Sequence, residues 1–374
     1  MQINSLKLQN FRSYEKLDLQ LGQNTIIIGQ NAQGKTNLLE AIYLCGVGKS
    51  YRAKEKDLVL WGEDFFRIEA ETKDEKQKIE FIYEKNVGKG RKTVKINGAK
   101  RASSALMDTL KCIFFSPEEI DMFFNFPSHR RRHFNIFIAQ QNPDYQRQLI
   151  RYGKVLEQRN SLLRLIREGR AKEEELEIWD GKLAEHGAEI ITKRQEITTE
   201  LNKSLAADYK NIAKGADSLS LSYQPATKEN LSDDVWAIFL KSLVSSRKMD
   251  IASGITNVGP HRDDFKFMFA GRSLGEFASR GEFRSAILAL KLSEAGILKD
   301  KTGAAPVLLL DDVFSELDAA RRKLLAQNFA GQQTIVTTTD LDHIDKSLAK
   351  EALVYEVKES KAKTILRGKN KNTQ

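Results

Sequence analysis

A complete phosphate-binding loop constrains this chain more than any other part of its sequence. Residues 29–36 read GQNAQGKT, which matches the pattern GxxxxGK[ST]. An apolar run, Thr25 to Ile28, precedes the loop, and a helix-forming run, residues 37–43, follows it. A strand, a loop and a helix in this order predict an α/β fold with the loop at the carboxyl edge of a parallel sheet.

The chemistry of this loop predicts a site for ATP and Mg²⁺. Its glycines let backbone N–H groups close around a polyphosphate, and the N-terminus of the following helix favours the anion. Lys35 can reach the β and γ phosphates, and the Thr36 hydroxyl can bind Mg²⁺. A chance match in a glycine-containing turn is the alternative, but it leaves the flanking strand and helix unexplained. The predicted nucleotide-binding residues are Gly29, Gln30, Asn31, Ala32, Gln33, Gly34, Lys35, Thr36 and Asn37.

A second apolar strand far downstream ends in two carboxylates. Residues 306–312 read PVLLLDD, which is typical of a buried parallel strand with the acids at its carboxyl end. This is the pattern of a Walker B strand, so Asp311 is predicted to hold Mg²⁺ and Asp312 to orient the attacking water. Taken alone, the run also fits a core strand that ends in an acidic turn.

Two further segments resemble the signature motif and the D-loop of ABC-type ATPases. Residues 279–282 read SRGE and precede a periodic helix, residues 283–298. Residues 315–318 read SELD and follow the two carboxylates. By this resemblance, Ser279 and Gly281 contact the γ-phosphate held by a second protomer, which makes ATP a dimerisation ligand. The structural alternative is an N-cap followed by an acidic first turn.

Length and composition predict a two-lobed, soluble, cytoplasmic protein. At 374 residues the chain exceeds one typical domain. No stretch approaches the roughly 20 uncharged apolar residues that span a bilayer, and the N-terminus alternates like a strand. Cys45 and Cys112 lie in apolar runs and predict no disulfide or metal framework.

The charge balance predicts a polyanionic partner, with nucleic acid as the commonest kind. Net charge is +9, and the last segment, residues 358–374, holds six Lys or Arg against one Glu. Other basic clusters lie at residues 89–92 and 100–101. Arg130, Arg131 and Arg132 stand between apolar runs and are candidates to reach ATP or DNA phosphates, whereas a solvated surface remains the alternative for any one cluster.

The middle of the chain predicts an antiparallel sheet followed by a helical region. Residues 66–72, 77–85 and 92–96 alternate as strands, and Asn97-Gly98 indicates a type I′ hairpin. Ser116-Pro117 begins a capped helix. Residues 143–209 then predict an αα-hairpin that breaks near residues 167–170, with arms of roughly 20 to 30 residues.

Over essentially its whole length the chain resembles the RecF family, bacterial recombination mediators related to SMC heads. The resemblance rests on several blocks: Asn10-Phe11-Arg12, GQNAQGKTNLLEAIY, Lys49-Ser50-Tyr51-Arg52, Phe115-Ser116-Pro117-Glu118, the arginine run, GPHRDD at residues 259–264, and LLLDDVFSELD. It implies that Arg12 contacts the nucleotide and that Arg52 is a candidate DNA contact. It further implies an ATP-dependent homodimer on duplex DNA, gaps or junctions of single- and double-stranded DNA. Its implied role is to assist RecA loading with RecR and RecO.

Three places depart from the family pattern or lack a physical account. The signature carries Arg280, Glu282 and then Phe283, where many members have glutamine-rich signatures. His133-Phe134-Asn135 after the arginine run is also atypical. The GPHRDD block fits a structural turn as well as a surface that faces a second protomer or DNA.

These observations predict an α/β fold like that of an ABC or SMC head. The P-loop ATPase lobe combines a mixed, mainly parallel core sheet with an antiparallel sheet, and a mainly helical second lobe is inserted. Residues 1–125 form the first half of the ATPase lobe, residues 126–250 the helical lobe, and residues 251–374 the second half.

The predicted activity is a weak, DNA-stimulated ATPase that acts as a switch. Lys35, Asp311, Asp312 and Ser279 are the predicted catalytic residues. Asp312 is one methylene shorter than the glutamate of fast ABC enzymes, and displacements of about 1 Å cost on the order of 100-fold in rate. An SMC-like structural head and the ATPase subunit of a membrane transporter remain the alternative functions.

Overall fold

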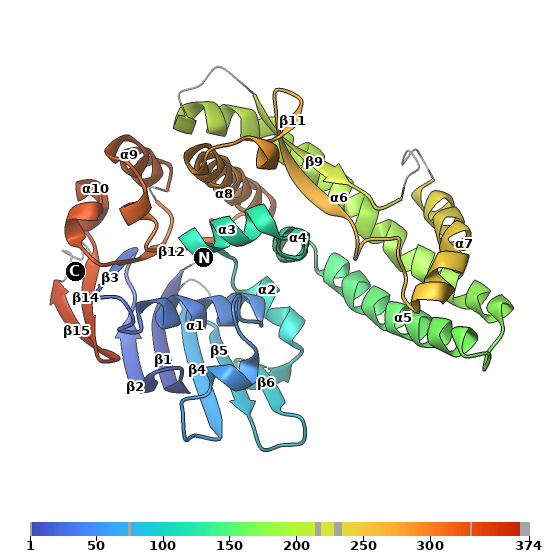
Figure 1. The fold of residues 1–374 in the computed structure, drawn as a ribbon. Coiled ribbons are helices and arrows are strands. Elements are labelled where there is room, and N and C mark those ends of the chain that lie inside the picture. The colour runs from blue at the N-terminus through green and yellow to red at the C-terminus, as the bar shows by residue number, and fades with distance from the viewer. Residues whose placement is uncertain (1, 74–75, 214–217, 228–233, 330, 367–374) are drawn as a thin grey trace. The chain divides into compact units, whose positions relative to one another are not determined.

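The computed structural model describes residues 2–73, 76–213, 218–227, 234–329 and 331–366, so residues 367–374 of the basic C-terminal segment lie outside it. The chain forms two compact units: residues 1–121 with 294–374, and residues 122–293 (Figure 1). Within the described ranges, no helix is both long and apolar enough to cross a membrane.

A six-stranded mixed sheet forms the core of the first unit. Five of its strands run parallel, and the sixth, at one edge, is antiparallel to its neighbour. The order is β15 (Lys361–Leu366), β14 (Leu353–Lys358), β3 (Asn24–Ile28), β13 (Thr334–Thr338), β12 (Val307–Asp311) and β8 (Cys112–Phe115). The two predicted nucleotide strands, β3 and β12, therefore flank β13, and all three end at the same edge of the sheet.

A second, antiparallel six-stranded sheet completes this unit. Its order is β2 (Tyr14–Gln20), β1 (Ile3–Phe11), β4 (Phe65–Thr72), β5 (Lys78–Glu84), β6 (Arg91–Ile96) and β7 (Ala99–Arg101). The predicted type I′ turn joins β6 to β7, with φ of 52° at Asn97 and 78° at Gly98. The predicted antiparallel sheet is thus confirmed.

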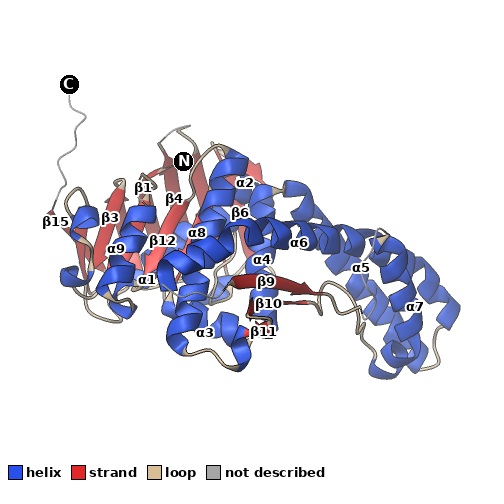
Figure 2. Ribbon diagram, turned by 90° about the horizontal axis from the view of Figure 1, so that it is seen from above, coloured by secondary structure: helices blue, strands red, loops and turns tan. Residues whose placement is uncertain are grey.

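Helix α1 (Lys35–Val47) contacts strands of both sheets, and eleven of its residues are buried. Because it is apolar on nearly all sides, it can fill the space between two layers. The other helices are α2 (Leu106–Thr109), α9 (Ala319–Asn328) and α10 (Lys346–Ala349), while α3 (Pro117–Asn125) and α8 (Arg280–Thr302) run across the unit junctions. Figure 2 shows the helices and the strands by type.

The second unit is mainly helical. It contains α4 (Pro127–Gln141), α5 (Pro143–Arg167), α6 (Leu176–Ala213) and α7 (Val235–Ser253). Helices α5 and α6 form the predicted αα-hairpin, although α6 has 38 residues and exceeds the predicted arm. The helix extends past residue 209 at its C-terminal end, where its apolar face continues to the buried Ile212.

A three-stranded sheet also belongs to the second unit. Strand β10 (Asp264–Phe269) pairs with β9 (Leu219–Gln224) on one side and with β11 (Arg272–Ser273) on the other. These pairings draw residues 251–293 into the second unit, whereas the sequence placed them in the ATPase lobe. Strands β9 and β10 pair residues that lie 40 to 50 positions apart, and a local pattern does not reveal such a pairing.

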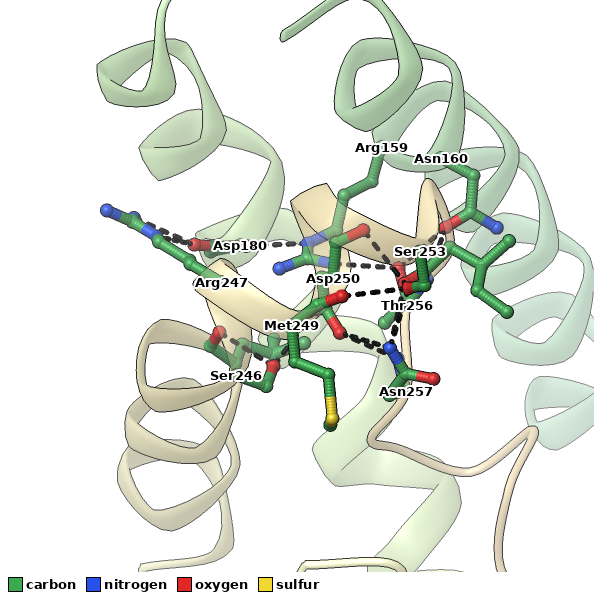
Figure 3. A network of polar contacts seen from close by, with 12 residues as sticks. Arg159, Asn160, Asp180, Ser246, Arg247, Met249, Asp250, Ser253, Thr256 and Asn257 are labelled. Atoms are coloured by element: carbon green, nitrogen blue, oxygen red, sulfur yellow. Dashed lines mark hydrogen bonds and ion pairs between the residues drawn. The ribbon is translucent and has the colours of Figure 1, made fainter. Parts of the chain in front are cut away.

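A buried polar network ties three helices of the second unit together (Figure 3). Arg159 of α5 donates to Asp180 of α6 at 2.7 Å, and to Asp250 of α7 and the Thr256 hydroxyl, both at 2.8 Å. The side chains of Arg159 and both aspartates are fully buried. Arg247 also donates to Asp180, at 2.8 Å. Two buried carboxylates thus surround one buried guanidinium, an arrangement that is stable only while both partners are present.

Candidate nucleotide-binding site

The loop of residues 29–34 connects β3 to α1 in a conformation that its sequence makes possible. Ala32 and Gly34 have φ values of 62° and 103°. A Cβ at Gly29 would lie 2.4 Å from the Val357 carbonyl oxygen, so only glycine fits there. The Tyr14 hydroxyl donates to the Gly34 carbonyl at 3.1 Å. The loop is therefore held by β2 of one sheet and packed against β14 of the other.

Lys35 folds back over this loop. Its Nζ donates to the carbonyls of Gly29 at 2.6 Å and Gln30 at 2.9 Å, and the residue is 7% exposed. Burial lowers its pKa, although the nearby Asp312 and Asp311 act in the opposite direction. The ammonium group is therefore poised where a phosphate oxygen would relieve its desolvation.

Thr36 and Asp311, 275 residues apart, meet at the end of the parallel sheet. The Thr36 hydroxyl donates to Asp311 Oδ1 at 3.0 Å, and the Thr337 hydroxyl donates to the same oxygen at 2.5 Å. Burial raises the pKa of Asp311. A hydroxyl and a carboxylate at this spacing fit Mg²⁺, which prefers oxygen ligands, and these two residues would hold it.

Asp312 has a strained backbone and an unsatisfied oxygen. Its φ is 50°, and its N–H donates to the Thr337 hydroxyl at 3.0 Å. Its Oδ1 is buried without a hydrogen bond from any described residue. A buried carboxylate oxygen in this state is costly, and it fits a water or ligand donor at the nucleotide site.

A buried glutamate on α1 joins the two arginines singled out in the sequence. Arg12 donates to both carboxylate oxygens of Glu40, at 2.8 and 2.9 Å, and Arg52 donates to Oε2 at 3.0 Å. The Ser50 hydroxyl adds a third donor at 2.5 Å. Burial alone would raise the pKa of Glu40, but these donors outweigh it and lower the pKa. The carboxylate therefore stays charged and fixes both guanidinium groups.

Arg52, predicted as a DNA contact, lies beside the phosphate-binding loop. Its Nη2 donates to Asn37 Oδ1 at 2.7 Å, directly after Thr36 in the chain. Burial is the largest single influence and would lower the pKa of Arg52, but the hydrogen bond to Glu40 and the nearby Tyr51, Glu40 and Asp311 charges together raise that pKa. The structure thus brings Arg12 and Arg52 together on one side of α1.

The signature residues lie at an exposed helix start in the second unit. Ser279, Gly281 and Glu282 are all exposed. The N–H and the hydroxyl of Ser279 each donate to Glu282 Oε2 at 2.8 Å, which is a capping arrangement. These contacts confirm the N-cap interpretation, and the signature interpretation stays a prediction.

The arginine run and the GPHRDD block are built into the second unit. Arg130 pairs with Asp264, and Arg131 donates to the Asp263 carbonyl at 2.8 Å. The buried carboxylate of Asp263 accepts from Arg194 at 3.0 Å and from the Tyr223 hydroxyl. These contacts give GPHRDD and Arg130 structural roles within this unit; Arg132 has a polar or ring contact as well.

Three residues of the site were not identified from the sequence. Thr337 could have been found, because TIVTT is an apolar strand whose carboxyl end carries hydroxyls. Glu40 stands out only as a charged residue in an apolar helix, and Tyr14 gives no signal because its contact with Gly34 is long-range.

Sequence comparison shows which known proteins this chain resembles. The family profile described as the RecF/RecN/SMC N-terminal domain matches residues 2–364. A protein named DNA replication and repair protein RecF from Agathobacter rectalis is 39% identical over 370 residues, covering 98% of this chain and 99% of the relative. The protein of that name from Bacillus cereus is 36% identical over 366 residues, covering 96% and 97%.

Solved structures agree with these relatives. The structure described as the recombination mediator protein RecF with ATP in the RecFOR pathway aligns with a TM-score of 0.89 at 34% identity, covering 98% of each chain. An Smc head domain from Pyrococcus furiosus aligns with a TM-score of 0.52 at 18% identity, covering 97% and 96%, and shares the fold alone. The predicted ATPase fold like that of an SMC head is thus confirmed, and the chain belongs to the RecF family.

Proposed function

We propose that this protein is an ATP-dependent DNA-binding protein of recombinational repair and replication-fork maintenance. The observation that carries the proposal is the convergence of Lys35, Thr36, Asp311 and Asp312 at the carboxyl ends of the parallel strands of one sheet. The relatives named as DNA replication and repair proteins, and the relative solved with ATP, support the same role for this chain.

In the proposed reaction, ATP and water give ADP and phosphate. Lys35 leaves the carbonyls of Gly29 and Gln30 to contact the β and γ phosphates. Thr36 and Asp311 would hold Mg²⁺, which would neutralise phosphate charge when bound. The unsatisfied Oδ1 of Asp312 orients the attacking water. Because this carboxylate is short, hydrolysis is slow and acts as a release switch.

Arg12 and Arg52 are proposed to act on the nucleotide from the side of α1. Glu40 holds both guanidinium groups, and Arg52 touches the residue after Thr36. A fixed guanidinium near a phosphate requires little reorganisation when it forms a charge-assisted hydrogen bond. We therefore propose that Arg52 contacts the nucleotide and not DNA.

The second half of each site is proposed to come from another copy of the chain. Ser279 and Gly281 are exposed at the start of a 23-residue helix, where an anion is favoured. ATP held by the loop of one protomer would then contact Ser279 of the other. The nucleotide thereby controls dimerisation, and the dimer closes on DNA.

Duplex DNA and junctions of single- and double-stranded DNA are the proposed substrates, and RecR with RecO are the proposed partners. The net charge of +9 favours a polyanion. Lys100 and Arg101 of β7 are exposed and remain candidates for phosphate contacts, together with Arg132. The relative solved with ATP is described as part of the RecFOR pathway, which supports the two protein partners.

Turnover with and without DNA tests this function against its two alternatives. We expect slow ATP hydrolysis that duplex or gapped DNA accelerates, and DNA affinity that falls as salt rises. A structural SMC-like head would hydrolyse almost nothing under either condition. The ATPase subunit of a transporter would hydrolyse ATP without a response to DNA.

A further inference from the structure

The arginine run and the GPHRDD block meet in an ion pair that the nucleotide chemistry does not use. Arg130 of α4 donates through Nε and Nη2 to the two carboxylate oxygens of Asp264, at 2.7 and 2.8 Å. The two side chains are 12% and 17% exposed. A parallel, two-bond pair of this kind fixes direction as well as distance. The pair therefore fixes the Arg130 side chain at the first residue of β10.

The remaining nitrogen of Arg130 holds the end of helix α3. Its Nη1 donates to the carbonyls of Phe123 at 2.6 Å and Phe124 at 2.8 Å. Carbonyls in the last turn of a helix lack partners within that helix, and a cation there is favourable. One side chain therefore ties the last turn of α3 to α4 and β10.

This last turn of α3 supports the first turn of α8. The ring of Phe124 meets the ring of Phe283 edge-on, with centroids 4.6 Å apart. Phe123 stacks on Phe267 of β10 at 5.6 Å, and Phe267 meets Phe283 at 6.0 Å. Phe283 is 6% exposed, and its N–H donates to the Ser279 carbonyl at 3.1 Å. The chain of contacts thus runs from Arg130 to the signature serine.

We propose that the Arg130–Asp264 pair is a positioning device for Ser279. Ser279 and the three residues after it are exposed, so the direction of this helix start depends on Phe283, which is buried beneath it. Arg130 holds Phe124 against Phe283 and so sets where Ser279 points. This inference rests on the proposed function, in which Ser279 serves the nucleotide of a second copy of the chain.

A mixing experiment separates positioning from a general structural role. Lys35→Ala protein lacks a working loop but keeps its signature, and Ser279→Arg protein has the reverse defect. A dimer with one copy of each contains one site in which the loop and the signature are both intact. If Arg130 acts through Ser279, Arg130→Met protein should behave like Ser279→Arg protein in every mixture.

We expect Arg130→Met alone to lower DNA-stimulated ATP turnover about 10- to 100-fold, as for a displacement near 1 Å. Nucleotide binding by the monomer should be unchanged. Adding Lys35→Ala protein should restore turnover, whereas adding Ser279→Arg protein should not. Phe124→Ala, which keeps the ion pair, should give the same pattern and carries the test if Arg130→Met does not fold. Arg170→Met, at an exposed arginine of the same unit, is the matched control and should retain turnover.

The mixing experiment distinguishes failure of the shared site from failure of the positioning role. If Lys35→Ala and Ser279→Arg proteins do not complement each other, the shared site itself is refuted, and the inference with it. If they do complement but neither Arg130→Met nor Phe124→Ala is restored by Lys35→Ala protein, only the positioning role is refuted. Restoration of Arg130→Met by Ser279→Arg protein would also overturn it, because the defect would then lie in the loop.

Discussion

At the scale of single residues, Glu40 shows how charge is kept inside the first unit. Its carboxylate is fully buried, yet it accepts from Arg12, Arg52 and Ser50. Burying a charge costs several kcal/mol, and hydrogen bonds of this number and geometry offset that cost. Removal of the carboxylate leaves two guanidinium groups without their shared partner.

Glu40→Gln should destabilise the first unit by about 3 kcal/mol at neutral pH. The pKa of Glu40 is lowered from its ordinary value of 4.5, so its contribution to stability is complete above that pH. It is lost as pH falls through the lower pKa of the folded state. Urea unfolding of both proteins from pH 7 to pH 3 measures this difference, which should shrink on the acid side. A difference that stays constant with pH would contradict the assignment.

Asp312→Asn should slow hydrolysis about 100-fold, because the carboxylate that orients the attacking water is lost. The amide is nearly isosteric, so ATP binding and nucleotide-driven dimerisation should persist. Single-turnover assays with DNA, together with sedimentation, measure the two properties. Asp342→Asn, an exposed acid after β13, is a suitable control. Unchanged turnover would refute the role given to Asp312.

At the scale of elements, local sequence patterns predicted the helices, strands and turns that depend on neighbouring residues alone. The strand, loop and helix around residues 29–36, the Asn97-Gly98 turn and the αα-hairpin all follow from period, glycine and capping signals. The order of the strands in the sheet does not follow from such signals, because β13 and β14 pair with β3, which lies far from them in the sequence. For the same reason, the partners of Arg130 and Glu40 were missed, since nothing within a few residues specifies them.

Among the contacts between helices, the buried ion pairs of Arg159 should contribute most to the stability of the second unit. Arg159→Met should destabilise the second unit by about 3–5 kcal/mol, because Asp180 and Asp250 would be left buried without this partner. Guanidinium-induced unfolding followed by circular dichroism measures the change. Arg170→Met should shift stability by less than about 0.5 kcal/mol. A loss below about 1 kcal/mol for Arg159→Met would show that the helices do not depend on this network.

At the scale of the whole molecule, the positive charge should govern how DNA is bound. Replacing Lys100 and Arg101 by glutamate should weaken binding to all duplexes alike and reduce the slope of log affinity against log salt by about 2. Filter-binding or anisotropy titrations between about 50 and 200 mM salt measure both quantities. An unchanged slope would place the DNA surface elsewhere.

The central claim is that two copies of this chain share each ATP. The loop and its carboxylates lie in the first unit, and Ser279 lies exposed in the second. A shared nucleotide therefore makes dimerisation depend on both parts, whereas nucleotide binding by one copy depends on the loop alone.

Sedimentation velocity with a non-hydrolysable ATP analogue, Mg²⁺ and duplex DNA tests this claim most directly. The wild-type chain should sediment as a dimer, and Ser279→Arg should remain a monomer that still binds the analogue. A wild-type monomer at saturating nucleotide, or an unchanged dimer of Ser279→Arg, would contradict the account.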